Sequence, residues 1–281
     1  MELKLVTNTA RSAVLELTES GKFYTELQYD IYVNGEKYME SNKVITSLFD
    51  LKPDTDYNVY AVYNGQKTNE VKIHTKYEFV TLNVRDFGTL GDGVHDDTNA
   101  IQCAIMACPK DSRVLVPEGE YKVSSVFLKS DLTLELAKGA VLSAFTERDK
   151  FPILPGVIES YDEKEEYNLG SWEGNPLDCF SAILCGINAE NVVITGEGTI
   201  DGNTTFENWW NNCKIRNTAW RPRLFFINHC NNVMMHGITV QNSPSWTIHP
   251  YFSNHLKFID VKIKNPANSH NTDGLDPESC Q

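Results

Sequence analysis

The first part of the chain alternates apolar and polar residues with a period of two. Residues 12–17, Ser-Ala-Val-Leu-Glu-Leu, and residues 27–33, Leu-Gln-Tyr-Asp-Ile-Tyr-Val, both follow this pattern, which is typical of a strand with one buried face. Asn34-Gly35 and Asn64-Gly65 favour the positive φ angles of a type I′ turn and therefore predict hairpins. Residues 1–76 are predicted to form a small antiparallel β-sandwich of about seven strands, the size of one immunoglobulin-like module.

The pattern changes after Val80. Residues 86–102 begin with a glycine-rich turn and present Asp96 or Asp97 as the N-cap of an apolar helix that ends near Cys108-Pro109. Paired aspartates and glycines also suggest a calcium or phosphate loop, but this segment lacks the ligand spacing of either. We therefore predict a structural role for it, as the cap of the element that follows.

The rest of the chain contains a repeat of short apolar segments that begin with Asn or His. Its clearest copies are Asn191–Gly196, Asn232–Gly237 and His255–Asp260, and Asp131–Leu136 fits an earlier copy. The spacing from Val233 to Leu256 is 23 residues, and a period in the twenties is the mark of a solenoid, in which no unit buries its own face. Strands of Val, Ile and Phe with Asn and Gly at the corners favour a β-solenoid over a helical one.

A longer excursion, residues 146–178, interrupts the repeats and is rich in Pro, Gly, Trp and acidic residues. Insertions of this kind lie on one face of a solenoid and often carry binding function. The excursion is therefore expected to wall off a cleft. Its acidic run, Asp162–Glu166, is interpreted as a solvated loop.

Composition and charge argue against several classes of function. The 281 residues carry a formal charge of −13, and the basic residues form no run, which argues against nucleic acid as a partner. No window approaches the ~18 consecutive apolar residues of a membrane span, so no membrane-embedded role is expected. A polyanionic ligand would need local basic residues, and the candidates are Arg221, Arg223, Lys262 and Lys264.

The seven cysteines form no Cys-x-x-Cys pair and no Cys/His spacing of a zinc site. They are predicted to be free, mostly buried thiols, and neither a metal nor another cofactor is predicted. Residues 1–5, Met-Glu-Leu-Lys-Leu, have neither the basic n-region nor the apolar h-region of a signal peptide. These features favour a cytoplasmic location, or a secreted or periplasmic one if a signal peptide has been removed.

Residues 51–57, Leu-Lys-Pro-Asp-Thr-Asp-Tyr, resemble the segment of fibronectin type III domains in which a tyrosine hydroxyl bonds back across a corner. The resemblance implies a fibronectin type III-like sandwich over residues 1–76, with Tyr57 as a structural residue. We expect this module to serve as a spacer or as a wall beside a site, rather than to bind carbohydrate itself.

Two motifs near the end of the chain carry a second resemblance. Residues 242–250, Asn-Ser-Pro-Ser-Trp-Thr-Ile-His-Pro, and residues 269–280, Ser-His-Asn-Thr-Asp-Gly-Leu-Asp-Pro-Glu-Ser-Cys, resemble, in the same order, those of the polygalacturonases, glycoside hydrolase family 28. The resemblance implies an all-β fold, a right-handed parallel β-helix of the pectin lyase-like type over residues 77–281. It also implies cleavage of α-1,4-galacturonosyl linkages of pectin or oligogalacturonate with inversion.

The same resemblance implies roles for individual residues. Asp273 would be a water-activating catalytic carboxylate. Trp246 would pack beneath the cleft, and Arg221, in an Arg-Pro-Arg segment similar to that of bacterial exo-acting members, would clamp a substrate carboxylate bidentately. The implied substrate-binding residues are Arg221, Trp246, His249, His270 and Asn271.

Inversion needs two carboxyl groups about 6.5–9.5 Å apart, so that a water molecule fits between one of them and the sugar. In the family, the other two catalytic carboxylates come from a later Gly-Asp-Asp-Cys segment, which these 281 residues do not contain. The resemblance therefore implies a β-helix that is incomplete at its C-terminus and inactive as given. An open terminal coil with unpaired edges would also favour self-association.

Several alternatives stay open at this point. Asn271–Gly274 is also the composition of a plain turn. Exo action is favoured by the N-terminal module and the long excursion. The competing functions are a rhamnogalacturonan hydrolase of the same family, a calcium-dependent pectate lyase and a non-catalytic glycan-binding β-solenoid.

Overall fold

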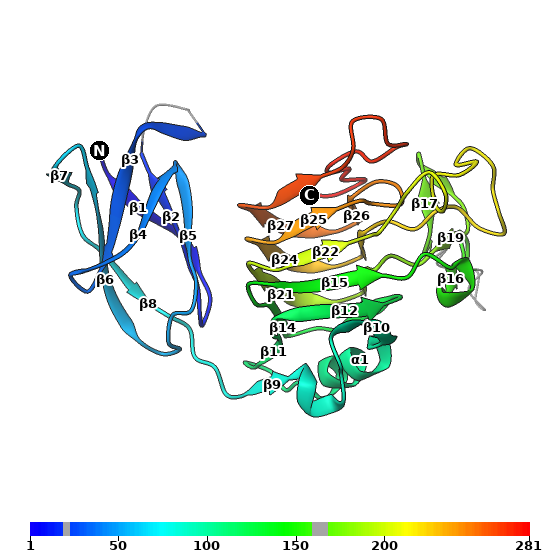
Figure 1. The fold of residues 1–281 in the computed structure, drawn as a ribbon, viewed down its shortest axis with the longest axis horizontal. Helices are drawn as coiled ribbons and strands as arrows, with labels where there is room; N and C mark the ends of the chain where they lie inside the picture. Colours follow the sequence, from blue (N-terminus) through cyan, green and yellow to red (C-terminus); the bar gives the residue numbers. More distant parts are fainter. Residues whose placement is uncertain (19–22, 159–167) are drawn as a thin grey trace. The chain divides into compact units, whose positions relative to one another are not determined.

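The computed structural model describes residues 1–18, 23–158 and 168–281. The chain forms two compact units, Met1–Phe79 and Val80–Gln281, which Figure 1 shows as a sandwich and a stack of coils. The boundary lies three residues after the one expected at residue 76. The acidic run predicted as a solvated loop, residues 162–166, lies outside the described residues.

The first unit is a sandwich of two antiparallel sheets that enclose a core of side chains such as Leu15, Ile31 and Val59. The smaller sheet consists of β1 (Leu3–Asn8), β2 (Ala13–Leu17) and β5 (Ile45–Leu48). The larger sheet consists of β3 (Tyr24–Val33), β4 (Glu36–Lys43), β6 (Asp56–Tyr63), β7 (Gln66–Lys67) and β8 (Val71–His74). The described part of this unit therefore has eight strands, where about seven were expected.

The predicted turns have the backbone geometry that their sequences favour. Asn34 and Gly35, between β3 and β4, have φ angles of 51° and 85°, and Asn64 and Gly65, between β6 and β7, have 48° and 73°. Both dipeptides thus adopt positive φ at both positions, as a type I′ turn requires. At the predicted corner, the Tyr57 hydroxyl accepts a hydrogen bond from the backbone N–H of Lys52 at 2.8 Å.

The second unit is a right-handed parallel β-helix, as predicted, and its coils contribute strands to three parallel sheets (Figure 1). The first sheet contains β9 (Thr81–Asn83), β11 (Arg113–Val116), β14 (Leu132–Leu136), β21 (Glu190–Gly196), β24 (Asn231–His236) and β27 (Asn254–Ile259). The second contains β10 (Asp92–Asp96), β12 (Gly119–Val123), β15 (Ala140–Ala144), β22 (Thr199–Asp201), β25 (Thr239–Gln241) and β28 (Lys262–Lys264). The third contains β13 (Val126–Leu128), β20 (Leu184–Ile187), β23 (Phe225–Asn228) and β26 (Ile248–Tyr251).

The sequence period sets the register of the coils. Val233 of β24 pairs with Leu256 of β27, so one 23-residue repeat is one coil. Leu134, Ile194 and Met235 occupy equivalent positions on three successive coils, and each is fully buried. Stacking equivalent apolar residues produces the continuous core that no single coil can form alone.

One end of the β-helix is covered by α1 (Thr98–Ala107), which follows the short 3-10 helix η1 (Val84–Phe87). Asp97 occupies the N-cap position, but its carboxylate accepts instead from the backbone N–H groups of Leu90 and Gly91. The N–H of Thr98 donates to Asp96. Both aspartates thus accept hydrogen bonds from the backbone, and the helix ends at Ala107 with Cys108 as its C-cap, close to the predicted end near Cys108-Pro109.

The corners of the coils are built from residues in the left-handed region of the backbone map. Asp131, Asn191, Asn232 and His255 stand at equivalent corners, with φ angles between 54° and 58°. Asn191 donates through its amide to Asp131, and Asn232 donates to Asn191, both at 2.9 Å. Asn and Asp tolerate this backbone conformation better than most residues, so the corner residues both permit the turn and link one coil to the next.

The excursion after β15 folds back onto the third sheet. Its described part, together with the two residues that follow it, contains η2 (Arg148–Lys150) and two small antiparallel pairs. These pairs join β16 (Ile153–Leu154) to β19 (Cys179–Phe180) and β17 (Ser171–Trp172) to β18 (Asn175–Pro176). Phe180 and Phe151 pack edge-on against the buried Trp209, so the base of the excursion is fixed to the core of the β-helix.

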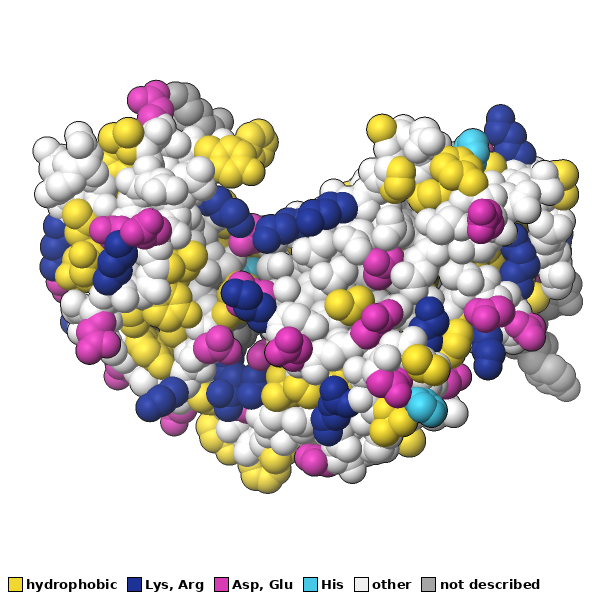
Figure 2. Space-filling view, viewed as in Figure 1, with side chains coloured by type: hydrophobic (Ala, Val, Ile, Leu, Met, Phe, Trp, Pro, Cys, Tyr) yellow, Lys and Arg dark blue, Asp and Glu magenta, His cyan; other side chains and the backbone are white. Residues whose placement is uncertain are grey.

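Acidic and basic side chains are interspersed over the face of each unit that Figure 2 shows. All seven cysteines are free thiols, and five of them are buried. No helix in the described part of the chain is long and apolar enough to cross a membrane.

The corner ladder gives a stability prediction. Asn232→Val loses the hydrogen bond to Asn191 and also places a β-branched residue at a φ of 55°, so we expect a loss of about 2–3 kcal/mol in the free energy of unfolding. Asn232→Gly tolerates the same φ and loses mainly the hydrogen bond to Asn191, so it should cost about 0.5–1.5 kcal/mol. Chemical denaturation of both variants measures the difference, and an equal or smaller loss for valine would contradict the assigned backbone strain.

Candidate active site

The candidate site lies where residues 273–278 form a further rung beside β26. Ile248 is bridged to Leu275 and Tyr251 to Glu278, both in parallel. Because neighbouring residues on a strand point to opposite faces, this register puts Asp276 and Glu278 on the same face as His249 and Tyr251. The two carboxylates thus stand over the outer face of the third sheet.

Asp273 is the first residue of this rung and is exposed, while its carbonyl oxygen accepts from the Thr247 N–H at 2.8 Å. The Asn265 amide donates to the Thr272 carbonyl and to the Thr247 hydroxyl. His270 is half-buried, and its ring meets that of Phe206 edge-on. The predicted catalytic carboxylate therefore sits on a turn whose backbone is fixed to the preceding coil.

Arg221, predicted as a carboxylate clamp, is almost completely buried, with 3% of its surface exposed. One of its guanidinium nitrogens donates to the carbonyls of Pro244 and His270, and another donates to the Asn271 side chain at 2.7 Å. Burial lowers the pKa of this guanidinium to about 10, so it is still charged at neutral pH. The described contacts make Arg221 a brace for the turn that carries Asn271 and Asp273.

Three tryptophans pack together beside this brace. Trp172 of the excursion stacks between Trp220 and Trp246, with ring centroids 5.1 and 5.6 Å away. Trp172 is buried, whereas the other two rings are half-exposed. The stack joins the excursion to the coil that precedes Asp273, and its half-exposed rings are the kind of surface on which sugar rings pack.

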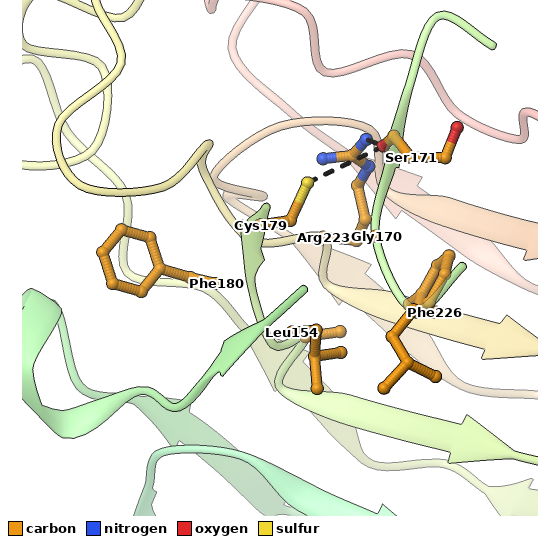
Figure 3. A pocket seen from close by; sticks show the side chains of 9 residues that line it. Leu154, Gly170, Ser171, Cys179, Phe180, Arg223 and Phe226 are labelled. Atoms are coloured by element: carbon orange, nitrogen blue, oxygen red, sulfur yellow. Dashed lines mark hydrogen bonds between the residues drawn. The ribbon is translucent and has the colours of Figure 1, made fainter. Parts of the chain in front are cut away.

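Arg223 is the most deeply buried charge of the site. Its guanidinium lies 4.6 Å from the Trp172 ring and 4.7 Å from the Trp246 ring. It donates to the carbonyls of Arg221 and Ser171, and Figure 3 shows it directed at Ser171 beside the Cys179 thiol. Since cation–π contacts gain strength when desolvated, the two rings help to hold this charge away from water.

His249 links Arg223 to Glu278. Arg223 Nε can only donate and lies 3.3 Å from His249 Nδ1, so that nitrogen must be the acceptor. The proton is then on Nε2, which donates to Glu278 at 3.1 Å. The Ser171 hydroxyl donates to the same carboxylate at 3.1 and 3.2 Å.

The charge states of this network follow from its contacts. Hydrogen bonds from His249 and Ser171 lower the pKa of Glu278. Burial, together with the nearby Arg223 charge, lowers the pKa of His249 and keeps its ring neutral. The network therefore contains a buried cation, a neutral imidazole with a fixed tautomer, and an ionised carboxylate at the surface.

The pKa of Asp276 is shifted upward, in the opposite direction to that of Glu278. Burial, together with the negative charge of Asp273, raises its pKa to about 6, and its buried Oδ2 atom has no hydrogen-bond partner. Asp276 and Glu278 thus lie on the same face of this rung, but their pKa values are shifted in opposite directions. Such a pair can supply a proton donor and an ionised group at the same pH.

A small pocket lies beneath the excursion (Figure 3). It is lined by Leu154, Leu169, Gly170, Ser171, Cys179, Phe180, Ala182, Arg223 and Phe226. Burial raises the pKa of the Cys179 thiol, so this thiol stays protonated. The apolar lining and the inert thiol indicate a packing defect under the excursion.

The structure brings the predicted site residues together on three successive coils, but in different environments. Asp273 and Asn271 are exposed, His270 and Trp246 are half-buried, and Arg221 and His249 are buried. Sequence reasoning missed Ser171 and Trp172, which come from the excursion, and the only signal for them was its tryptophan content. Among the described residues, no group of three or more His, Cys, Asp or Glu side chains is arranged to hold a metal ion.

Comparison with known proteins identifies relatives of the β-helix. The family model described as glycosyl hydrolases family 28 matches residues 110–281. A probable polygalacturonase of Vitis vinifera is 32% identical over 204 residues, which cover 69% of this chain and 39% of that protein. An exo-poly-alpha-D-galacturonosidase of Dickeya chrysanthemi is 34% identical over 165 residues, or 54% of this chain and 25% of that protein. The chain thus spans well under half the length of these two relatives.

Solved structures show the same fold. The Yersinia enterocolitica family 28 exopolygalacturonase superposes with a TM-score of 0.73 at 21% identity, covering all of this chain and 61% of that one. A Thermotoga maritima exopolygalacturonase gives a TM-score of 0.59 at 26% identity, covering 73% of this chain and 51% of that one.

Asp276 gives a pH-dependent prediction. Its folded pKa of about 6 exceeds the usual value near 3.9, so the stability that this group contributes below pH 4 is lost as the pH rises through 6. Asp276→Asn should therefore raise the free energy of unfolding above pH 6 by about 1 kcal/mol, a figure reduced for solvent screening, and have no such effect below pH 4. Urea denaturation across this range tests it, with the exposed Glu207→Gln as control. A benefit independent of pH would contradict the prediction.

Arg221 gives a second prediction. Arg221→Met leaves the carbonyls of Pro244 and His270 and the Asn271 side chain without their donor, so we expect a loss of about 2–4 kcal/mol in the free energy of unfolding and faster amide exchange in residues 268–274. Arg216 is the matched control, because it is an exposed arginine paired with Asp178 at 3.0 Å, and Arg216→Met should cost under about 1 kcal/mol. Similar losses for both variants would show that Arg221 does not brace the turn.

Proposed function

The chain belongs to glycosyl hydrolases family 28, and on that premise we propose that it acts on pectin or oligogalacturonate as a polygalacturonase, by hydrolysis of galacturonosyl linkages. One observation carries the proposal: the rung over β26 holds Asp273, Asp276 and Glu278 beside the half-exposed Trp246. Carboxylates next to an aromatic surface are what hydrolysis of a glycosidic bond requires.

In this proposal, Asp273 is the carboxylate that activates water. It is exposed to solvent and to substrate, and the braced turn fixes its direction, since Thr247 holds its backbone from the coil below. Its electrostatic coupling to Asp276 means that the charge on one group affects the protonation of the other. Hydrolysis would proceed with inversion at the anomeric carbon, with water entering opposite to the leaving oxygen.

Exo action is the finer part of the proposal. It is supported by the way the excursion closes over the third sheet: Ser171 contacts Glu278, and the Asn168 amide donates to the Tyr251 hydroxyl at 3.1 Å. A loop docked in this way would block one end of a cleft, so that the enzyme removes residues from a chain end. The names of the Dickeya, Yersinia and Thermotoga relatives point in the same direction.

The uronate groups of the substrate need cations, and the donors of Arg221 and Arg223 face the protein. The exposed lysines of β28, Lys262 and Lys264, are better placed for this task. Lys264 precedes Asn265, whose amide holds the Thr272 carbonyl, so this lysine flanks the turn that carries Asp273. We propose that Lys264 meets a substrate carboxylate as a flexible point charge.

The proposal predicts the effect of one substitution. In the full-length protein that carries these residues, Asp273→Asn should lower the rate of hydrolysis of polygalacturonate by about 10²–10⁴-fold, since the amide cannot accept a proton from water. Binding of oligogalacturonate should survive, because the amide keeps the shape of the carboxylate. Reducing-end release measures the rate, and calorimetric titration measures the binding.

The reaction products distinguish exo-acting hydrolysis from the alternative functions. Exo action predicts that reducing ends appear long before the viscosity of the polymer falls. Unsaturated products that depend on calcium would identify a lyase, and binding without turnover would identify a glycan-binding solenoid. Asp276→Asn is the matched variant: if it abolished hydrolysis while Asp273→Asn did not, the role assigned to Asp273 would be wrong.

A further inference from the structure

We propose that Glu278 is a specificity-determining residue, a fixed carboxylate that accepts hydrogen bonds from sugar hydroxyl groups and keeps a uronate carboxylate away from its position. The inference rests on the proposed function, and it names the chemical group of the substrate that lies at this end of the site. Its support is the geometry around Glu278.

Glu278 is held from two sides by different parts of the chain. His249 Nε2 donates to Oε2 from the coil below, and the Ser171 hydroxyl donates to both carboxylate oxygens from the excursion. His249 cannot turn away, because its other nitrogen accepts from Arg223. An anchored carboxylate loses little conformational entropy when it accepts a further hydrogen bond.

The carboxylate still faces the surface. Its side chain is 24% exposed, while that of His249 is completely buried. A carboxylate has about four lone-pair positions, and the described contacts use three of them, counting one for His249 and two for Ser171. The remaining acceptor capacity is available to a donor from solvent or from a ligand, and the donors of a sugar are its hydroxyl groups.

The charge of Glu278 is not neutralised at close range. His249 is neutral, and Arg223 donates to carbonyl, hydroxyl and imidazole acceptors rather than directly to this carboxylate. Asp276 and Asp273 lie on the same side and add negative charge. A uronate placed here would meet like charges in a partly desolvated site, whereas a hydroxyl would meet an acceptor.

The excursion holds Glu278 in the position in which it favours a hydroxyl group over a uronate carboxylate. Ser171 is buried, and its carbonyl is held by the buried Arg223 (Figure 3). Trp172, the next residue, is clamped between two tryptophan rings. The sugar ring at this end is therefore one that turns its hydroxyl face, and not its carboxyl group, toward the rung that carries Glu278.

Two ligands of equal length test the inference: trigalacturonate and its fully methyl-esterified form, which is uncharged. Glu278→Gln should tighten the binding of trigalacturonate by about threefold to tenfold, with a smaller gain at high salt. It should leave the ester within about twofold, because glutamine still accepts a hydrogen bond. Calorimetric titration of the purified full-length protein measures both, and thermal melting checks that the variant is folded.

Glu173→Gln is the matched control, because it removes the same charge from an exposed position in the excursion, two residues after Ser171. It should change the ratio of the two affinities by under about twofold. An equal change for both ligands in Glu278→Gln, or no change in their ratio, would overturn the inference alone. If the unmodified protein bound neither ligand, the proposed function and the inference would fail together.

Discussion

The parallel register of the coils is the constraint on which the rest of this structure depends. Each coil buries its apolar face only by stacking on its neighbours, and left-handed corner residues such as Asn191 and Asn232 make that stacking possible at every turn. Because the register is fixed, a residue on one coil has a defined neighbour on the next. His249 of β26 therefore comes to lie under the rung that carries Asp276 and Glu278, although the sequence separates them by more than twenty positions.

A second constraint acts across the coils and concerns buried charge. A guanidinium removed from water is costly unless its donors find acceptors. Arg223 donates to two carbonyls, a hydroxyl and an imidazole, and it also lies against two tryptophan rings. These partners come from the excursion as well as from the coils. One buried cation thus fixes the docking of the excursion, the tautomer of His249 and, through it, the ionised state of Glu278.

The sequence was sufficient for the coils because their signal is periodic. The 23-residue spacing located β24 and β27 and placed Val233 over Leu256, and the Asn-Gly dipeptides located both hairpin turns. The excursion has no period, so nothing in its sequence indicated that Ser171 would bond to a carboxylate 107 positions away. The role of Arg221 could not be predicted from the sequence either, because an arginine near a site can clamp a substrate or brace a turn. Only its burial and its acceptors in the structure distinguish the two roles.

The net charge of −13 opposes the polyanionic substrate proposed above at long range, so the charges close to the site matter more than the total. Exposed charges further apart than about 10 Å are largely screened at moderate salt, so the groups within reach of one sugar ring decide its binding. The exposed lysines of β28 precede the braced turn along the chain, and Asp276 and Glu278 follow it. A sugar that carries a carboxyl group on one edge and hydroxyl groups on another can satisfy both sets of charges only in one orientation. Local charge of both signs therefore orients such a substrate, which a uniformly basic cleft would bind in several ways.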